Sequence, residues 1–297
     1  MKLAAIDIGS NAARLLITEV FENEYAEPVF NKINLIRVPL RLGIDVFENG
    51  VISKDKANKL IETIKAYKHL LSIYEVKHLK ACATSAMRDA ANASDILKQV
   101  KDATGIDIKI ISGSEEASYI NENHVAEHLD KDHSYLYIDV GGGSTELTFF
   151  AKEKMVFKSS FNIGTIRLLK KKVKDEHWEE MKEYIKHHTK NYNNITAIGS
   201  GGNINKVFSL SKKKEGKPLH IDLLKDYLKE LSNVSLQERI ELYKLREDRA
   251  DVIVPALQIY VNVMRWADIE EIYVPKIGLA DGLIHLLYEE VKALSSP

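Results

Sequence analysis

The first part of the chain alternates apolar runs with short polar turns. Residues 3–8 and 15–20 are apolar runs with the composition of β-strands, and a polar Gly-Ser-Asn turn separates them. A third β-rich run follows at residues 29–42. We therefore expect the chain to open with a β-hairpin and a third strand.

The pattern then changes to the spacing of helices. Ser53 is placed to cap a long amphipathic helix, because apolar residues recur every three or four positions after it. Strands are expected at residues 78–83 and 106–111, and helices at residues 94–103 and 115–128. This alternating order predicts an α/β domain.

The same order begins again near the middle of the chain. Residues 135–140 have the pattern of a buried strand, a Gly-Gly-Gly-Ser turn follows, and strands are expected at residues 145–151 and 154–162. Asp7 and Asp139 both lie at the end of a strand, just before a glycine-serine turn. Chance similarity of two strand-turn units is the alternative, but the repeated β-β-β-α-β-α order favours an internal duplication.

The rest of the second half continues the α/β pattern. Further strands are expected at residues 195–198 and 272–274. Further helices are expected at residues 164–173, 176–188, 203–210, 223–231, 236–242, 249–266 and 280–294. The polar stretch 127–133 lies between the repeats, so we expect domains at residues 1–126 and 127–297. Packing of the terminal helix back onto the first domain stays open.

The composition is that of an ordinary globular protein. The 297-residue chain is 45% hydrophobic and 29% charged, with 42 basic and 43 acidic residues. It has no run of about 18 to 20 apolar residues and no signal-peptide core, so we expect a cytoplasmic protein without a membrane partner. The near-neutral charge argues against a nucleic-acid partner. The single cysteine, Cys82, excludes an internal disulfide and a cysteine metal cluster.

Three glycine-containing turns directly follow apolar strands. They are Gly9, Ser10 and Asn11; Gly141, Gly142, Gly143 and Ser144; and Gly199, Ser200, Gly201 and Gly202. Successive backbone N–H groups in such turns form concave sites for phosphate oxygens. A single turn of this kind often only reverses the chain, but three of them favour a phosphate-binding cleft between the domains.

Four motifs together resemble one known family. In chain order they are Asp7-Ile8-Gly9-Ser10-Asn11, Ala83-Thr84-Ser85-Ala86-Met87-Arg88-Asp89-Ala90, Ile111-Ser112-Gly113-Ser114-Glu115-Glu116-Ala117 and Asp139-Val140-Gly141-Gly142-Gly143-Ser144-Thr145-Glu146. This combination is similar to the exopolyphosphatase / guanosine pentaphosphate phosphohydrolase (Ppx/GppA) phosphatase family. The resemblance covers essentially the whole chain. It implies an α/β fold of two duplicated ribonuclease H-like domains, as in the actin, Hsp70 and sugar kinase superfamily, around an interdomain cleft.

Two positions depart from the family pattern. Ala280 stands where the family usually has a basic residue, and Ala12 stands where a serine is common. Longer members also carry an HD-type metal-dependent domain, so a chain ending at Pro297 is expected to be the short, two-domain form. These departures leave the preferred substrate length open.

Two adjacent glutamates are expected to open one helix. Ser112 and Glu115 have the spacing of a capping box, which gives Glu115 a structural explanation. Glu116 has no such explanation, and a carboxylate in the first turn of a helix is held ionised by the macrodipole. By itself this pattern is also typical of a glutamate that only stabilises the start of the helix and has no catalytic role. The family resemblance implies that Glu116 is the catalytic base.

Arg88 lies shortly after Ser85, in what we expect to be the first turn of a helix. A cation there is slightly unfavourable to the helix macrodipole, so an arginine at this position suggests a role other than stabilising the helix. Its guanidinium group can hold a phosphate through two hydrogen bonds, and the resemblance implies a phosphate-contacting arginine at this position. A surface ion pair with Asp89 or Asp95 is the alternative.

Carboxylates at the ends of strands are candidate magnesium ligands. Asp139 ends a strand and Glu146 lies across the glycine turn, so a hairpin can return both to one end of a cleft. Mg²⁺ usually takes only one or two protein carboxylates together with water and substrate phosphates. Asp7 is a further candidate, directly or through water. The alternative is that these acids cap turns.

The leading hypothesis is an Mg²⁺-dependent hydrolase that releases the terminal phosphate of inorganic polyphosphate. Guanosine pentaphosphate is the alternative substrate, and a kinase-like phosphotransferase or an ATP-gated binding module is a weaker alternative. Lys170, Lys171, Lys172 and Lys174 on one expected helix, or Lys212, Lys213 and Lys214 in a loop, could bind the tail of a long polyanion. A homodimer stays open.

Overall fold

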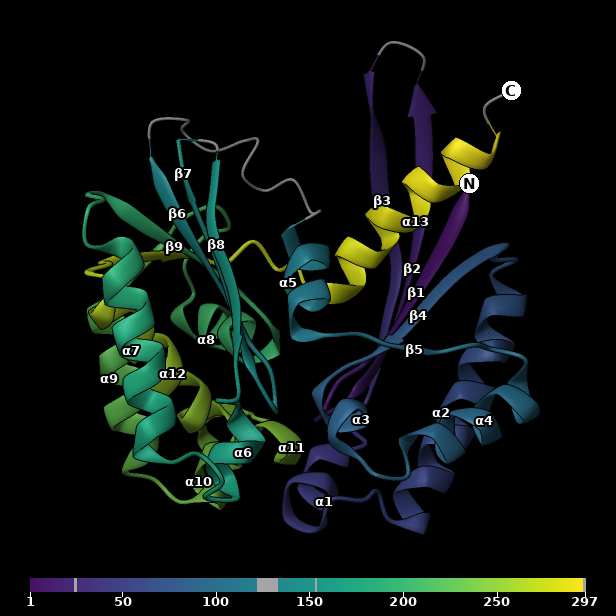
Figure 1. Ribbon diagram of the computed structural model, residues 1–297, viewed down its shortest axis with the longest axis horizontal. Helices are drawn as coiled ribbons and strands as arrows, with labels where there is room; N and C mark the ends of the chain where they lie inside the picture. The colour runs from purple at the N-terminus through teal and green to yellow at the C-terminus, as the bar shows by residue number, and fades with distance from the viewer. Residues whose placement is uncertain (24–25, 122–132, 153, 296–297) are drawn as a thin grey trace. The chain divides into compact units, whose positions relative to one another are not determined.

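The structure is a computed structural model that describes residues 1–23, 26–121, 133–152 and 154–295 (Figure 1). The chain divides into two compact units. The first comprises Met1–Asn123 together with Leu279–Pro297, and the second comprises His124–Gly278. The boundary expected at residues 126 and 127 lies outside the described residues.

The first unit is built on a five-stranded mixed sheet. Its strand order is β3-β2-β1-β4-β5, with β1 antiparallel to β2 and parallel to β4. The strands are β1 (Lys2–Ile8), β2 (Ala13–Asn23), β3 (Ala26–Val38), β4 (His78–Ala83) and β5 (Lys109–Ile110). The expected opening hairpin and third strand are confirmed, and β5 is shorter than the run at residues 106–111 suggests.

Helices follow β3, β4 and β5 of this unit. They are α1 (Leu42–Asn49), α2 (Lys54–Ile73), α3 (Ser85–Asp89), α4 (Ala93–Thr104) and α5 (Gly113–Asn121). Ser53 caps α2 as predicted, because its side chain accepts a hydrogen bond from the Lys56 N–H. Helix α1 was not predicted; Arg41, with a φ of 53°, separates it from β3. The last part of the helix expected at 115–128 lies outside the described residues.

The C-terminal helix α13 (Leu279–Ser295) belongs to the first unit. It lies along the sheet (Figure 1) and packs on β1 and α5. Leu283 and Ile284 are buried against Leu3 and Leu16. Burying one such side chain contributes about 1.5–3 kcal/mol, so this helix is an integral part of the core.

The second unit repeats the topology of the first. Its sheet has the order β10-β11-β9-β6-β7-β8, and the five strands β8-β7-β6-β9-β11 correspond to β3-β2-β1-β4-β5. The strands are β6 (Ser134–Val140), β7 (Thr145–Ala151), β8 (Lys154–Phe161), β9 (Ile195–Ser200), β10 (Leu219–His220) and β11 (Glu271–Tyr273). The internal duplication predicted from the strand-turn repeat is confirmed.

Several helices complete the second unit. They are α6 (Thr165–Leu169), α7 (Asp175–Thr189), α8 (Gly202–Ser211), α9 (Ile221–Ser232), α10 (Leu236–Tyr243), α11 (Glu247–Ala250) and α12 (Ile253–Trp266). Of these, α7, α8, α9 and α12 pack on strands of its sheet. The single helix expected at residues 249–266 is therefore two helices. Among the described residues of the whole chain, no helix has the length and apolar character needed to cross a membrane.

The lysine run at residues 170–174 is not helical, contrary to the prediction. Helix α6 ends at Leu169 and α7 begins at Asp175. Lys171 has a φ of 53°, which is incompatible with a continuing right-handed helix. The lysines form the connection between two helices.

Candidate functional site

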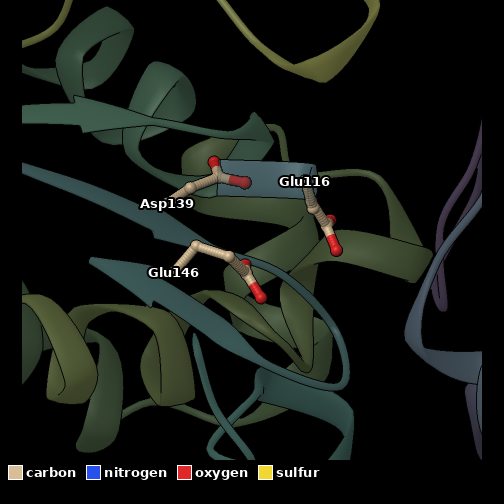
Figure 2. Close-up of side chains that lie close together, drawn as sticks. All are labelled: Glu116, Asp139 and Glu146. Atoms are coloured by element: carbon tan, nitrogen blue, oxygen red, sulfur yellow. The ribbon is translucent and has the colours of Figure 1, made fainter. Parts of the chain in front are cut away.

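The end of β6 and the start of β7 bring two carboxylates together. Asp139 and Glu146 are direct partners in the antiparallel register, and carboxylate oxygens of the two lie within 4.8 Å of one another (Figure 2). Glu146 is only 2% exposed, and the Ser160 hydroxyl donates to its Oε1 at 2.9 Å. Two neighbouring carboxylates repel each other, and an oxygen-binding divalent cation would neutralise that repulsion. The donor set therefore fits Mg²⁺.

The turn after β9 supports Asp139. The Ser200 hydroxyl donates to Asp139 Oδ1 at 2.6 Å. Gly201 has a φ of 102°, and a Cβ built there would lie 3.1 Å from the same Oδ1 atom. A glycine is therefore required at this position both by the backbone conformation and by the approach of the carboxylate.

Tyr260 of α12 holds the same turn from the core side. Its hydroxyl donates to the Ser200 carbonyl at 2.5 Å. Burial, and secondly the charge of Asp139, raises the pKa of Tyr260 well above its ordinary value, so the hydroxyl keeps its proton and remains a donor. Tyr260 was not predicted as a site residue, because a tyrosine at helical spacing usually indicates a side chain that packs in the core.

The corresponding place in the first unit has a different charge pattern. Asp7 on β1 pairs in register with Arg14 on β2, and Arg14 Nη1 donates to Asp7 Oδ2 at 2.7 Å. Burial raises the pKa of Asp7, whereas Arg14 acts in the opposite direction. Asp7 therefore already has a cationic partner where Asp139 has Glu146.

The two strand-turn-strand segments close in the same way. The Gly9 N–H donates to the Ala12 carbonyl at 3.0 Å, and the Gly141 N–H donates to the Ser144 carbonyl at 2.9 Å. In the first unit the Ser10 and Ser85 hydroxyls are also hydrogen-bonded, at 2.7 Å, which joins the β1 turn to the start of α3. The structure thus brings the first two family motifs together.

Arg88 lies in a different helical position from the one predicted. Helix α3 has five residues, so Arg88 is in its last turn, where a cation is favourable to the macrodipole. The electrostatic argument for a functional arginine therefore fails. Arg88 Nη1 donates to the Ile111 carbonyl at 2.8 Å, which holds it beside the segment that leads into α5.

The two glutamates at the start of α5 have different surroundings. The Glu115 N–H donates to Ser112 Oγ at 3.1 Å and the Ser112 N–H donates to Glu115 Oε2 at 2.9 Å, so the predicted capping box is confirmed. Hydrogen bonds from Lys109 and from Ser112 lower the pKa of Glu115 to about 2. Glu116 is instead buried, with 7% exposure.

Cys82 on β4 lies beside Asp7 on β1, and its thiol is influenced by the charges of both Asp7 and Glu116. Cys82 pairs with Asp7 in the β1–β4 register. Burial raises the pKa of its thiol, and the charges of Asp7 and Glu116 raise it further. Three family motifs, on β1, β4 and α5, therefore converge within this unit.

Comparisons with known proteins agree with this arrangement. Residues 22–291 match the Ppx/GppA phosphatase family. The chain is 30% identical over 261 residues to a bifunctional 3-dehydroquinate synthase/phosphatase of Fusobacterium nucleatum, and this match covers 81% of the chain but only 38% of that protein. It is 25% identical to exopolyphosphatase 1 of Mycobacterium bovis over 96% of the chain and 87% of the relative. The crystal structure of the Aquifex aeolicus member of the Ppx/GppA family is similar with a TM-score of 0.76 and 26% identity, over 100% of this chain and 99% of that one.

Proposed function

The chain belongs to the Ppx/GppA phosphatase family, and from this we propose that it releases the terminal phosphate of inorganic polyphosphate with the help of Mg²⁺. Members of the family are hydrolases that act on phosphoanhydrides. The observation that carries the proposal is the directly paired Asp139 and Glu146 beside a glycine turn, a donor set suited to a metal that binds phosphate. Similarity to an exopolyphosphatase over most of both chains supports the choice of substrate.

Asp139 and Glu146 are the residues that would hold the magnesium ion. When bound, the ion supplies positive charge that neutralises the oxygens of the transferred phosphoryl group. The Ser200 and Ser160 hydroxyls orient the two carboxylates. We assign Asp7 a supporting role through water, because Arg14 already balances its charge.

Glu116 is the proposed general base. Its carboxylate is buried in the first unit, and a carboxylate is a group that can accept a proton from an attacking water. As the water oxygen bonds to the terminal phosphorus, its proton passes to Glu116. The bond from that phosphorus to the bridging oxygen then breaks, and inorganic phosphate and the shortened chain leave.

The glycine turns and Arg88 would bind the phosphates. Backbone N–H groups of the turns that begin at Gly9, Gly141 and Gly199, other than the Gly9 and Gly141 N–H groups that close their turns, would supply donors. Arg88 would supply a positive charge held in place by the Ile111 carbonyl. Positioning and charge neutralisation account for most of the catalysis of phosphoryl transfer. A cytoplasmic location belongs to the same proposal.

A panel of substrates tests this function. Phosphate release would be measured from long polyphosphate, tripolyphosphate, guanosine pentaphosphate, ATP and p-nitrophenyl phosphate, each with and without Mg²⁺. We expect the highest kcat/KM with polyphosphate and loss of turnover without the metal. Preference for guanosine pentaphosphate would identify the alternative substrate, and turnover of p-nitrophenyl phosphate alone would contradict the proposal.

A further inference from the structure

The carbonyl groups of Gly141, Gly142 and Gly143 are all hydrogen-bonded to one short helix, α6. The Thr165 N–H donates to the Gly141 carbonyl at 3.0 Å, and the Ile166 N–H donates to the Gly142 carbonyl at 2.8 Å. The Arg167 side chain completes the set, because its Nε donates to the Gly143 carbonyl at 2.6 Å. Three successive carbonyls therefore point toward α6.

This arrangement determines where the N–H groups of the turn point. The described peptide bonds are trans, so each carbonyl is antiparallel to the N–H of the next residue. With three carbonyls directed at α6, the N–H groups of Gly142, Gly143 and Ser144 point to the opposite side. Three successive N–H groups on one side form a concave site for an anion.

Gly164, which precedes α6, allows the helix to approach the turn. A Cβ built on Gly164 would lie 2.4 Å from the Gly143 carbonyl carbon and 2.5 Å from the Gly142 carbonyl oxygen. Both atoms are backbone and cannot move aside without shifting the turn. No residue with a side chain fits here in this conformation.

The first unit repeats the arrangement. Helix α1 follows β3 as α6 follows β8, and it also holds carbonyls of the strand-connecting turn. The Arg41 N–H donates to the Asn11 carbonyl at 2.9 Å, and the Gly43 N–H donates to the Ser10 carbonyl at 2.9 Å. Its occurrence in both units indicates that this contact is part of the duplicated fold and is not an accident of one loop.

We propose that Arg167 and Gly164 are positioning residues for phosphate binding, which act by orienting the Gly141–Ser144 N–H groups. Glycine peptides flip easily because they have no Cβ. Among the three donors to these carbonyls, Arg167 alone donates from its side chain, and this hydrogen bond restrains the Gly143 carbonyl. Without it, the Gly143–Ser144 peptide is free to rotate, and the anion site loses a donor. The inference rests on the proposed assignment of this turn to phosphate.

The test compares three arginine variants of the full chain. Arg167→Gln removes the charged donor, Arg167→Lys keeps a charge that can reach the carbonyl, and Arg265→Gln changes an exposed arginine of the same unit as a control. Binding of inorganic phosphate would be measured by titration calorimetry, and KM and kcat with tripolyphosphate. Thermal unfolding would verify that each variant folds.

We expect Arg167→Gln to weaken phosphate binding roughly 10-fold or more, the usual worth of a hydrogen bond to a charged group. KM should rise by a similar factor, Arg167→Lys should recover part of the loss, and Arg265→Gln should match wild type. Gly164→Ala, which displaces the turn directly, should weaken phosphate binding at least as much.

Two results would overturn the inference. One is a folded Arg167→Gln variant whose phosphate affinity and KM equal those of wild type. The other is a wild-type protein that binds no phosphate. A wild-type protein that binds phosphate but hydrolyses no polyphosphate would contradict the proposed function alone, since phosphate affinity of the variants still measures the role of Arg167.

Discussion

Asp139 and Glu146 face each other across β6 and β7, at the position where the first unit pairs Asp7 with Arg14. The same fold therefore holds two like charges in one unit and a neutralised pair in the other. We expect Asp139→Asn and Glu146→Gln each to raise the Mg²⁺ concentration needed for half-maximal turnover, because each removes ligand charge. Metal titrations of the exposed-acid variant Asp175→Asn should superimpose on those of wild type. Superimposed titrations for Asp139→Asn would contradict the metal assignment.

Glu116 and Glu115 offer a matched pair of variants on one helix. Glu116→Gln should leave the fold intact and lower kcat by roughly 10² to 10⁴, the usual contribution of a general base. Glu115→Gln should leave kcat close to wild type, because Glu115 serves the capping box and contacts Lys109. Steady-state kinetics with saturating polyphosphate measures both. Equal losses in the two variants would show that Glu116 acts only through the helix end.

Glu115 should make the stability of the protein depend on acid pH. Its pKa falls from 4.5 to about 2 on folding, chiefly through the Lys109 hydrogen bond. A group whose pKa is lowered on folding stabilises the fold above its unfolded value, and this contribution is lost as pH falls from about 4.5 to about 2. The Tm difference between wild type and Glu115→Gln should therefore be present at neutral pH and shrink across that range. A pH-independent difference would show that the carboxylate charge does not contribute.

Tyr260 should stabilise the β9 turn through its hydroxyl. Tyr260→Phe keeps the packing of the ring but leaves the buried Ser200 carbonyl without this donor, at a cost of about 1–3 kcal/mol in the free energy of unfolding. The comparison is Tyr243→Phe, which removes a hydroxyl bonded to Glu230 at an exposed position. Urea denaturation should show a much smaller change in the free energy of unfolding for Tyr243→Phe than for Tyr260→Phe. Equal midpoints for Tyr260→Phe and wild type would contradict a stabilising role.

The lysines between α6 and α7 should distinguish long substrates from short ones. Lys170 to Lys174 lie just after α6, the helix bonded to the Gly141–Ser144 turn, so we expect the tail of a long chain bound at that turn to pass near them. Replacing Lys170, Lys171, Lys172 and Lys174 with glutamine should raise KM for long polyphosphate and weaken its salt dependence, while KM for tripolyphosphate stays unchanged. Replacing Lys212, Lys213 and Lys214, the alternative cluster, should leave KM for both substrates unchanged, and a raised KM for long polyphosphate there instead would assign the tail to that loop. Equal changes in KM for long and short substrates would reject a role in binding the tail.

The strands were predictable because their signals are local. The strand-turn repeats around Asp7 and Asp139 and the cap at Ser53 depend on residues close together in the chain, and the structure confirms these elements. Helix ends were less predictable. Lys171 and Arg41 adopt positive φ in positions where their residue type gives no warning.

The sequence by itself determined the duplicated α/β architecture and the family, because burial periodicity and glycine-serine turns are properties of short segments. It also placed the candidate acids at strand ends. Only the tertiary structure decided that Asp7 pairs with Arg14 while Asp139 meets Glu146, and that Arg88 ends a helix. It alone shows that α6 binds the carbonyls of Gly141, Gly142 and Gly143, which directs them away from the proposed phosphate side. The physical reason is that register and hydrogen-bond direction depend on packing between segments that lie far apart in the chain.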